Sequence, residues 1–170
     1  MGTIMSQFHS PMRSILFVCT GNIFRSLAAE QALKVLLGPQ SSYLVGSAGI
    51  DARPQPVHEW VRARLSMKGA DPSGHVQRQV TREMVEASDL VIAMSRNHQA
   101  FIRERFGREV PLFNRVCFGC DEPIPDVHEV MPTWEEDLVL ARAYVLSVID
   151  AIWEATPMLV SRLQFFHREQ

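Results

Sequence analysis

The chain alternates between short, wholly apolar runs and longer stretches in which apolar and polar residues are mixed. Residues 15–18 (ILFV) and 90–94 (LVIAM) contain no polar side chain, which is typical of strands buried on both faces of a parallel sheet. Residues 42–46 and 110–113 are weaker strand candidates. The pattern therefore predicts a sheet of short strands that begins near residue 15.

The mixed stretches have the periodicity of helices that bury one face. Helices are expected over residues 27–37, 57–67 and 97–106. Gly69 should end the second of these, and a further helix should begin after Thr81, which would cap it. Apolar residues spaced by four and three predict a long last helix against the sheet: Trp134, Leu138, Ala141, Val145, Val148 and Ile152. Alternating strands and helices predict an open α/β sheet with a ligand at the carboxyl ends of its strands.

Length and composition indicate one globular domain. The chain has 170 residues, of which 46% are hydrophobic and 21% charged. We expect a flexible extension over residues 1–13 and a domain over residues 14–156. Because Pro157 should interrupt the last helix, we expect an apolar tail over residues 157–170 that packs on the domain or on a partner.

Charge and cysteine content narrow the class of protein further. A net charge of −2 offers no basic surface for nucleic acid or for a membrane, so neither partner is expected. The apolar runs are far shorter than the roughly 20 residues that span a bilayer. Three cysteines (Cys19, Cys117 and Cys120) are too few for a secreted disulfide framework, and residues 1–13 lack the apolar core of a signal peptide. A cytoplasmic location is therefore expected.

One segment, residues 19–26 (CTGNIFRS), stands between the first predicted strand and the first predicted helix. A strand, a tight loop and a helix in this order direct backbone N–H groups and a helix N-terminus at an anion. Cys19 would lie at the floor of such a loop and Arg25 at its exit. A nucleotide-binding loop does not fit, because the Gly-Lys-Ser/Thr ending is absent. The segment predicts a phosphate-binding loop that carries a nucleophile.

The residue types in this loop suit attack by sulfur on phosphorus. Only about 3% of an ordinary cysteine is thiolate at pH 7, and the thiolate is the nucleophile, so the loop has to favour the anion. Backbone amides and Arg25 would do so, and Ser26 can donate a hydrogen bond to Cys19. Gly21 leaves room for phosphate oxygens, Asn22 can brace the loop, and Arg25 can hold two phosphoryl oxygens. The loop is completed by Thr20, Ile23 and Phe24.

These residues resemble the loop of the low-molecular-weight protein tyrosine phosphatase family, Cys-x-Gly-Asn-x-x-Arg-Ser. Residues 47–49 (SAG), 73–79 and 89–94 are similar to further landmarks of that family, so the resemblance extends over about residues 14–154. It implies a four-stranded parallel sheet with helices on both faces and hydrolysis of phosphotyrosine through a cysteinyl-phosphate, with no metal or other cofactor. The implied partner is a tyrosine-phosphorylated protein; in a bacterium, an autophosphorylating tyrosine kinase is suggested.

The resemblance also implies a proton donor, because a tyrosyl leaving group has a pKa near 10. The family uses an aspartate before the last helix, which corresponds here to Asp126, with Asp121 as second choice. Val127 replaces the family's proline, which predicts a more mobile acid loop. His128 stands where an aromatic residue usually flanks the phosphotyrosine ring. Residues 50–53 bring no tryptophan to the cleft wall, so a weak grip on the ring is expected. Phe24 replaces a second cysteine, so Cys19 lacks its usual neighbour for a protective disulfide.

Three other functions stay open. A thiol-dependent arsenate reductase shares the loop in some families, but it needs a further cysteine where Met94 and Ser95 stand. Protein-arginine phosphatases of the family carry threonine at the position of Ile23, whose branched apolar side chain favours a flat tyrosyl ring. A phosphate-binding module without catalysis is the third.

The remaining histidines and cysteines are interpreted as structural. His75 matches a family position and is expected to brace the loop rather than to catalyse. His58 and His98 lie on helical patterns and are expected to be surface or partly buried residues. Cys117 and Cys120 have the spacing of a zinc or redox pair, but no second Cys/His pair accompanies them, so ordinary thiols are expected.

Overall fold

The computed structural model of the chain describes residues 14–166. Within that range three parallel strands form one open sheet in the order β2-β1-β3, with β1 (Ser14–Cys19), β2 (Leu44–Gly49) and β3 (Leu90–Ala93). The central strand β1 pairs Cys19 with Gly49 on one side and Val18 with Ala93 on the other. The predicted open α/β sheet is therefore confirmed, and Cys19 lies at the carboxyl end of its central strand.

The expectation of four strands was wrong for the described residues. Leu112 makes a single parallel bridge to Ala93, whose N–H donates to the Pro111 carbonyl at 2.9 Å. Pro111 has no N–H with which to continue a ladder, and helix α5 (Phe113–Phe118) begins directly after the bridge. The weaker candidate at residues 42–46 does form a strand, as β2, but displaced toward Gly49.

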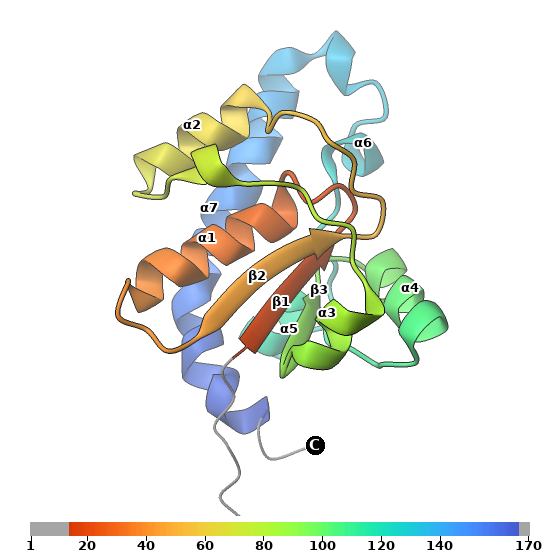
Figure 1. Cartoon of the computed structure of the whole chain (residues 1–170). Coiled ribbons are helices and arrows are strands. Elements are labelled where there is room, and N and C mark those ends of the chain that lie inside the picture. Colours follow the sequence, from red (N-terminus) through yellow and green to blue (C-terminus); the bar gives the residue numbers. More distant parts are fainter. Residues whose placement is uncertain (1–13, 167–170) are drawn as a thin grey trace, which may run out of the picture.

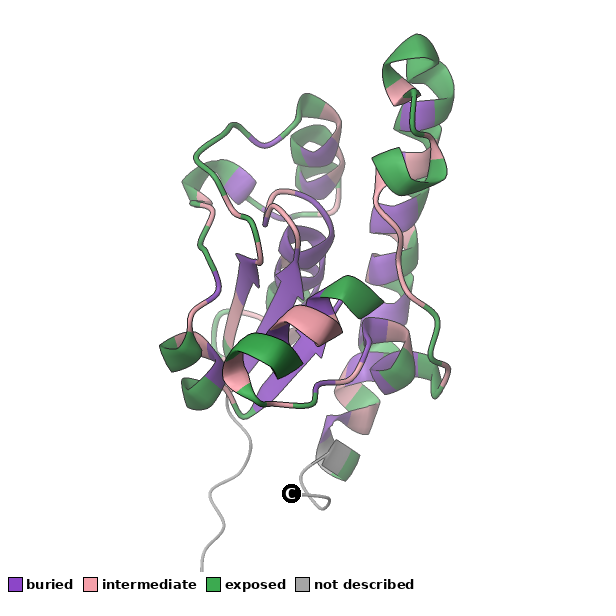
Figure 2. Ribbon diagram, turned by 90° about the vertical axis from the view of Figure 1, so that its right-hand side faces the viewer, coloured by how far each residue is buried: buried purple, intermediate pink, exposed green. Residues whose placement is uncertain are grey.

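Helices cover both faces of the sheet (Figure 1). The larger core joins one face of β1 to α1 (Arg25–Leu37), α2 (Glu59–Met67), α5 and α7 (Leu138–Phe166). The smaller core joins the other face to α3 (Arg82–Ala87) and α4 (Arg96–Phe106). Figure 2 shows that the strands are largely buried while the helices expose their outer sides. Because β1 lies between two cores, residues 15–19 are all buried, which explains the apolar run.

The last helix, α7, is longer than expected. It runs unbroken through Pro157, so the predicted interruption was wrong. Proline in a helix interior costs roughly 3 kcal/mol. Beyond it, however, Leu159 and Leu163 are buried in the larger core, and burying two leucines contributes about as much or more. Trp134 lies outside α7, in the short helix η2 (Trp134–Glu136).

Two sequence predictions concern the ends of the chain and its relation to membranes. The extension expected over residues 1–13 lies outside the described residues, as do residues 167–170 of the expected tail. None of the helices in the described range combines the length and the apolar composition that a bilayer crossing requires.

Three short elements complete the fold: η1 (Pro72–Gly74), α6 (Val127–Val130) and η2.

Candidate active site

The loop between β1 and α1 lies at the carboxyl edge of the sheet. Cys19 ends the strand and Arg25 begins the helix. The amides of Ile50 and Asp51 donate to the carbonyls of Cys19 and Thr20, both at 2.9 Å. These bonds turn the two carbonyl oxygens toward the segment after β2, which leaves the inner side of the loop to N–H groups. Cys19 itself is 2% exposed, as expected of a group at the floor of the loop.

Gly49, at the end of β2, allows the loop to pass close by. A Cβ atom at Gly49 would lie 2.3 Å from the carbonyl oxygen of Thr20 and 3.0 Å from the amide nitrogen of Asn22. A side chain there would displace the loop backbone. At Gly21, by contrast, the nearest atom to an added Cβ would be a side-chain carbon of Ile23 at 3.4 Å. The backbone of the loop therefore requires a glycine at position 49, whereas the role predicted for Gly21, room for phosphate oxygens, stays a prediction.

We expect Gly49→Ala to weaken binding of inorganic phosphate by roughly 10- to 100-fold. Loss of one hydrogen bond to a charged ligand costs about 1.5–3 kcal/mol, which corresponds to this range. Isothermal titration calorimetry measures the effect. Gly74→Ala is the matched control, because no atom lies within 4 Å of a Cβ added there. Unchanged phosphate affinity in a folded Gly49→Ala variant would show that this close approach does not shape the loop.

Asn22 fixes the direction of the hydrogen bonds around the sulfur. It is buried and has a left-handed backbone, with φ of 57°. Its Oδ1 accepts from the amide of Arg78 at 3.0 Å, so its Nδ2 donates to Ser47 Oγ at 2.8 Å and to Ser26 Oγ at 3.0 Å. Ser26 Oγ, which accepts from Asn22, lies 2.9 Å from Cys19 Sγ, and either of these two groups can be the donor. The network thus places a hydroxyl that can donate beside the sulfur.

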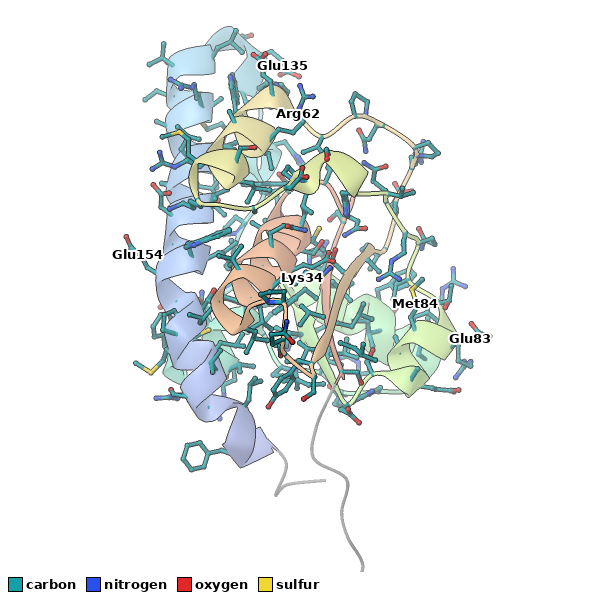
Figure 3. The ribbon with its side chains drawn as sticks, turned by 60° about the vertical axis from the view of Figure 1, so that its left-hand side comes forward. Lys34, Arg62, Glu83, Met84, Glu135 and Glu154 are labelled. Atoms are coloured by element: carbon teal, nitrogen blue, oxygen red, sulfur yellow. The ribbon has the colours of Figure 1, made fainter. Side chains whose placement is uncertain are left out.

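Further residues hold Asn22 in place. His75 Nε2 lies 2.6 Å from the Asn22 carbonyl, so the prediction that His75 braces the loop is confirmed. Ser47 donates to the buried carboxylate of Glu30, which also accepts from Lys34 at 2.5 Å. Lys34 lies in the last turn of α1 (Figure 3). The loop is thus braced by α1 and by the segment after η1 as well as by β2.

Arg25 is buried and is held by groups from two segments, the residue Ser95 after β3 and the loop before α6. Its Nη1 donates to Ser95 Oγ at 3.0 Å and to the Ile124 carbonyl at 2.7 Å. Its Nη2 donates to the Asp126 carboxylate at 3.1 Å. Among the described residues, no acceptor faces its Nε–H. A buried donor without a partner costs about 1–3 kcal/mol, so Arg25 retains one N–H that a bound anion would satisfy.

Asp126 precedes α6 and points its carboxylate at Arg25, with 19% of its side chain exposed. Its Oδ1 accepts from the Val127 amide at 2.7 Å, and its own amide donates to Glu129. The second-choice acid, Asp121, is exposed and lies 3.7 Å from Arg115 instead. The structure thus brings Arg25 and Asp126 into contact beside the Cys19 loop and leaves Asp121 outside it.

His98 touches the loop, which the sequence analysis did not predict. It is fully buried, so its assignment as a surface or partly buried residue was wrong. Its Nδ1 accepts from the Ser95 amide at 3.0 Å, so Nε2 carries the hydrogen and donates to Thr20 Oγ1 at 2.9 Å. Burial, and after it the charge of Arg25, lowers the pKa of His98 to about 3, so the ring is neutral. Thr20 therefore accepts from His98 and keeps its hydroxyl hydrogen for another acceptor.

A cleft of about 380 Å³ lies beside the loop. Its wall includes Trp60 and Trp134, whose rings meet edge to face with centroids 6.4 Å apart. The ring centroid of His58 lies 4.4 Å from that of Trp60. Figure 3 shows Arg62 and Glu135, from α2 and η2, at the same end of the molecule. His128 lines the cleft as well, with 61% of its side chain exposed. The cleft is also lined by Thr20, Gly21, Ile23, Phe24, Asp126 and Val127.

The other cysteines do not join the site. All three cysteines are free thiols. Burial raises the pKa of Cys117 to about 12, so this thiol stays protonated and unreactive at neutral pH. Cys120 is partly buried at the end of α5, with its sulfur 3.9 Å from the Asn114 carbonyl. Within residues 14–166, no group of three or more His, Cys, Asp or Glu side chains could hold a metal ion.

Comparison with known proteins finds this loop and fold among phosphatases. The family described as low molecular weight phosphotyrosine protein phosphatase matches residues 14–117. The protein-arginine-phosphatase of Bacillus subtilis (strain 168) is 35% identical over 95 residues, which are 55% of this chain and 63% of that protein. The low molecular weight protein-tyrosine-phosphatase Wzb of Escherichia coli (strain K12) is 33% identical over 118 residues, 66% of this chain and 77% of that protein.

A solved structure extends the match to nearly the whole fold. The arginine phosphatase YwlE from Geobacillus stearothermophilus superposes with a TM-score of 0.74 at 26% identity, over 90% of this chain and 94% of that one. By sequence, the chain spans 63% of the length of the Bacillus relative. The family match ends at residue 117, before Asp126, so the position of Asp126 beside the loop comes from the structure.

Proposed function

Since the chain belongs to the low-molecular-weight phosphotyrosine protein phosphatase family, we propose that it hydrolyses phosphotyrosine in proteins through a cysteinyl-phosphate intermediate. Cys19 is the nucleophile, Arg25 binds the phosphoryl group, and Asp126 is the general acid and base. The observation that supports this best is the 3.1 Å contact between Arg25 and Asp126, beside a loop in which the Ser26 hydroxyl lies 2.9 Å from the Cys19 sulfur.

Binding begins with an exchange of anions on Arg25. A phosphate dianion replaces the Asp126 carboxylate, because the guanidinium binds phosphate oxygens through two parallel N–H donors. The Nε–H that has no acceptor among the described residues and the Nη2 that now contacts Asp126 lie on the same edge of the guanidinium. Asp126, released from Arg25, then lies beside the bound phosphoryl group and, in this proposal, carries the proton that the leaving group needs. The exchange thus delivers a carboxylic acid to the leaving oxygen.

Two displacements at phosphorus follow. The Cys19 sulfur attacks in line, an S–P bond forms, and the P–O bond to tyrosine breaks as Asp126 gives its proton to the departing oxygen. Water then attacks the cysteinyl-phosphate, Asp126 accepts a proton from that water, and the P–S bond breaks. The products are tyrosine, inorganic phosphate and the Cys19 thiolate, and Asp126 is protonated for the next turnover.

The tryptophans of the cleft wall would hold the substrate ring. We expect Trp134→Ala to raise KM for a phosphotyrosyl peptide by roughly threefold to tenfold, since an aromatic pair contributes about 0.5–1.5 kcal/mol beyond its buried area. Steady-state kinetics measures this. Trp153→Ala is the control, because Trp153 packs partly buried against the core, outside the cleft. An equal rise in KM for both variants would contradict the assignment.

A protein-arginine phosphatase is the second candidate, because two of the similar proteins carry that name. The loop chemistry serves P–N as well as P–O cleavage, so the choice depends on the groups beyond phosphorus. Ile23 lines the cleft and offers a guanidinium no hydrogen-bond partner. The aromatic wall of Trp60 and Trp134 suits a flat ring, which supports tyrosine as the first choice.

Matched peptides that carry phosphotyrosine, phosphoarginine or phosphoserine test the proposal on the full chain. We expect kcat/KM for phosphotyrosine to exceed that for phosphoarginine by about tenfold or more. A reversed order would support the arginine phosphatase. Phosphate binding without turnover of any peptide would support a binding module, and thioredoxin-dependent reduction of arsenate would support the reductase.

We further propose that the protein is cytoplasmic and acts on a protein there, which its three free thiols support. An autophosphorylating tyrosine kinase is the first partner to test, because the similar proteins are bacterial. A Cys19→Ser variant would retain such a phosphoprotein without turning it over. If free phosphotyrosine releases the retained kinase from the Cys19→Ser variant, the result would support the kinase as a partner. If the kinase stays bound, the result would count against it.

A further inference from the structure

Tyr144 ties the acid loop to the long helix. It lies on α7, and its hydroxyl donates to the carbonyl of Pro125 at 2.6 Å. Pro125 immediately precedes Asp126 and has no N–H, so its carbonyl is the only polar backbone group by which it can be held. A partly buried side chain on the longest helix thus fixes the residue next to the proposed acid.

We propose that Tyr144 is a positioning residue for the reaction, which keeps the Asp126 carboxyl at the leaving oxygen through its hydrogen bond to Pro125. Tyr144 contacts neither Cys19 nor the phosphoryl group in this scheme. The inference rests on the proposed role of Asp126 as general acid.

The other tethers of the acid loop show why Tyr144 matters most after substrate binds. The Ile124 amide donates to the Met94 carbonyl at 2.8 Å, which fixes the loop two residues before Asp126. Asp126 itself is held directly by Arg25. When phosphate takes Arg25, that direct tether is lost, whereas the bond from Tyr144 to Pro125 remains. Tyr144 therefore holds the loop at the stage at which the acid has to act.

The surroundings of Tyr144 keep its hydroxyl a donor. Burial raises the pKa of Tyr144, and the carboxylates of Asp126 and Glu129 raise it further, against an opposing effect of Arg25. The phenol therefore stays protonated throughout the neutral range. Glu129 adds a second support, because it accepts the hydrogen bond from the Asp126 amide. The loop is held at Pro125 from α7 and at Asp126 from its own α6.

Tyr144→Phe tests the inference, because it removes the hydroxyl and retains the ring. We expect kcat/KM for phenyl phosphate, a poor leaving group, to fall by about tenfold, the value of one hydrogen bond. For an ester of an acidic nitrophenol, which needs no proton, kcat/KM should change by less than about twofold. A loss of stability alone would lower both values together, so the ratio separates positioning from general damage.

Two further variants make the test specific. Tyr43→Phe is the matched control, because Tyr43 is the only other tyrosine and precedes β2 at the end of the sheet opposite the loop. It should leave both esters unchanged. In an Asp126→Asn background, Tyr144→Phe should cause no additional loss with phenyl phosphate, since the acid that it positions is absent.

The outcomes separate this inference from the function on which it rests. An unchanged phenyl phosphate rate in Tyr144→Phe, an equal fall for both esters, or a full additional loss in the Asp126→Asn background would overturn the role of Tyr144. Wild-type chain that hydrolyses neither ester would instead overturn the proposed function, and equal losses by Asp126→Asn for both esters would overturn the role of Asp126 within it.

Discussion

Replacement of Cys19 by serine should abolish turnover of phosphotyrosyl peptides while phosphate still binds. A serine hydroxyl is of similar size but is not ionised at neutral pH, so the nucleophile is lost. Arg25 and the loop that Asn22 and Ser26 brace should remain in place, and we expect Arg25 and the loop amides still to bind the phosphoryl group. We expect kcat to fall by roughly 10⁴-fold or more, as for other nucleophile replacements, with the phosphate dissociation constant changed by about threefold at most.

The two halves of this result are measured separately, by stopped assays of phosphate release and by calorimetric titration with inorganic phosphate. Cys120→Ser is the matched control, because it makes the same substitution at a partly buried thiol outside the site. It should retain full activity. Substantial turnover by Cys19→Ser would contradict the assignment of the nucleophile, and equal losses in both variants would indicate damage to the fold.

Replacement of Asp126 by asparagine should slow only those substrates whose leaving group needs a proton. Asparagine has the size of aspartate but cannot act as an acid. A positioned acid contributes about 10²- to 10⁴-fold, so kcat/KM for a phosphotyrosyl peptide should fall within that range. For an ester of an acidic nitrophenol, kcat/KM should change by about threefold at most. A plot of log kcat/KM against the pKa of the leaving group measures the effect as a steeper slope in the variant.

Asp121→Asn is the control for this series, since Asp121 is an exposed aspartate a few residues earlier in the same segment. It should reproduce the slope of the wild type. Equal losses by Asp126→Asn across all leaving groups would remove Asp126 from its role. A steeper slope in Asp121→Asn would move the role to that residue.

The loop at residues 19–26 could be predicted from the sequence because its parts are contiguous. Residues 19–26 follow a buried strand and precede a helix, and in such a segment local chain direction alone brings Cys19, Ser26 and Arg25 together. The open α/β sheet could be predicted for a similar reason, since apolar runs and helical periodicity are local signals. The proposed acid, Asp126, required a resemblance because it lies far along the chain.

The errors in the fold came from proline, whose effect depends on its surroundings. Pro111 ended the possible fourth strand, although the residues around it are apolar enough for one. Pro157 did not end a helix, because the leucines beyond it are buried in the core. The local rules for proline are the same in both places. Tertiary packing decided the outcome, and packing is not visible in a single sequence.

The missed site residues act through contacts between distant segments. His98 was expected to be a surface or partly buried residue of a helix, yet it is fully buried and donates to Thr20 in the loop. Trp60 and Trp134 form the cleft wall only because α2 and η2 meet in space. Gly49 was noted in the sequence only as part of a segment that resembles the family. The reason that a glycine is needed there, the close passage of the loop, is visible only in the structure. Tyr144 carried no sequence signal of its own.

A trapping experiment tests the central claim, that Cys19 carries the phosphoryl group between the two displacements. The full chain is mixed with excess phosphotyrosyl peptide, quenched rapidly in acid, digested and analysed by mass spectrometry. We expect a phosphorylated peptide that contains Cys19. With an ester of an acidic nitrophenol, whose first displacement needs no proton, this peptide should be more abundant in Asp126→Asn, because only the second displacement is then slowed. Rapid turnover with no phosphate on the protein, or with phosphate on any other residue, would contradict it.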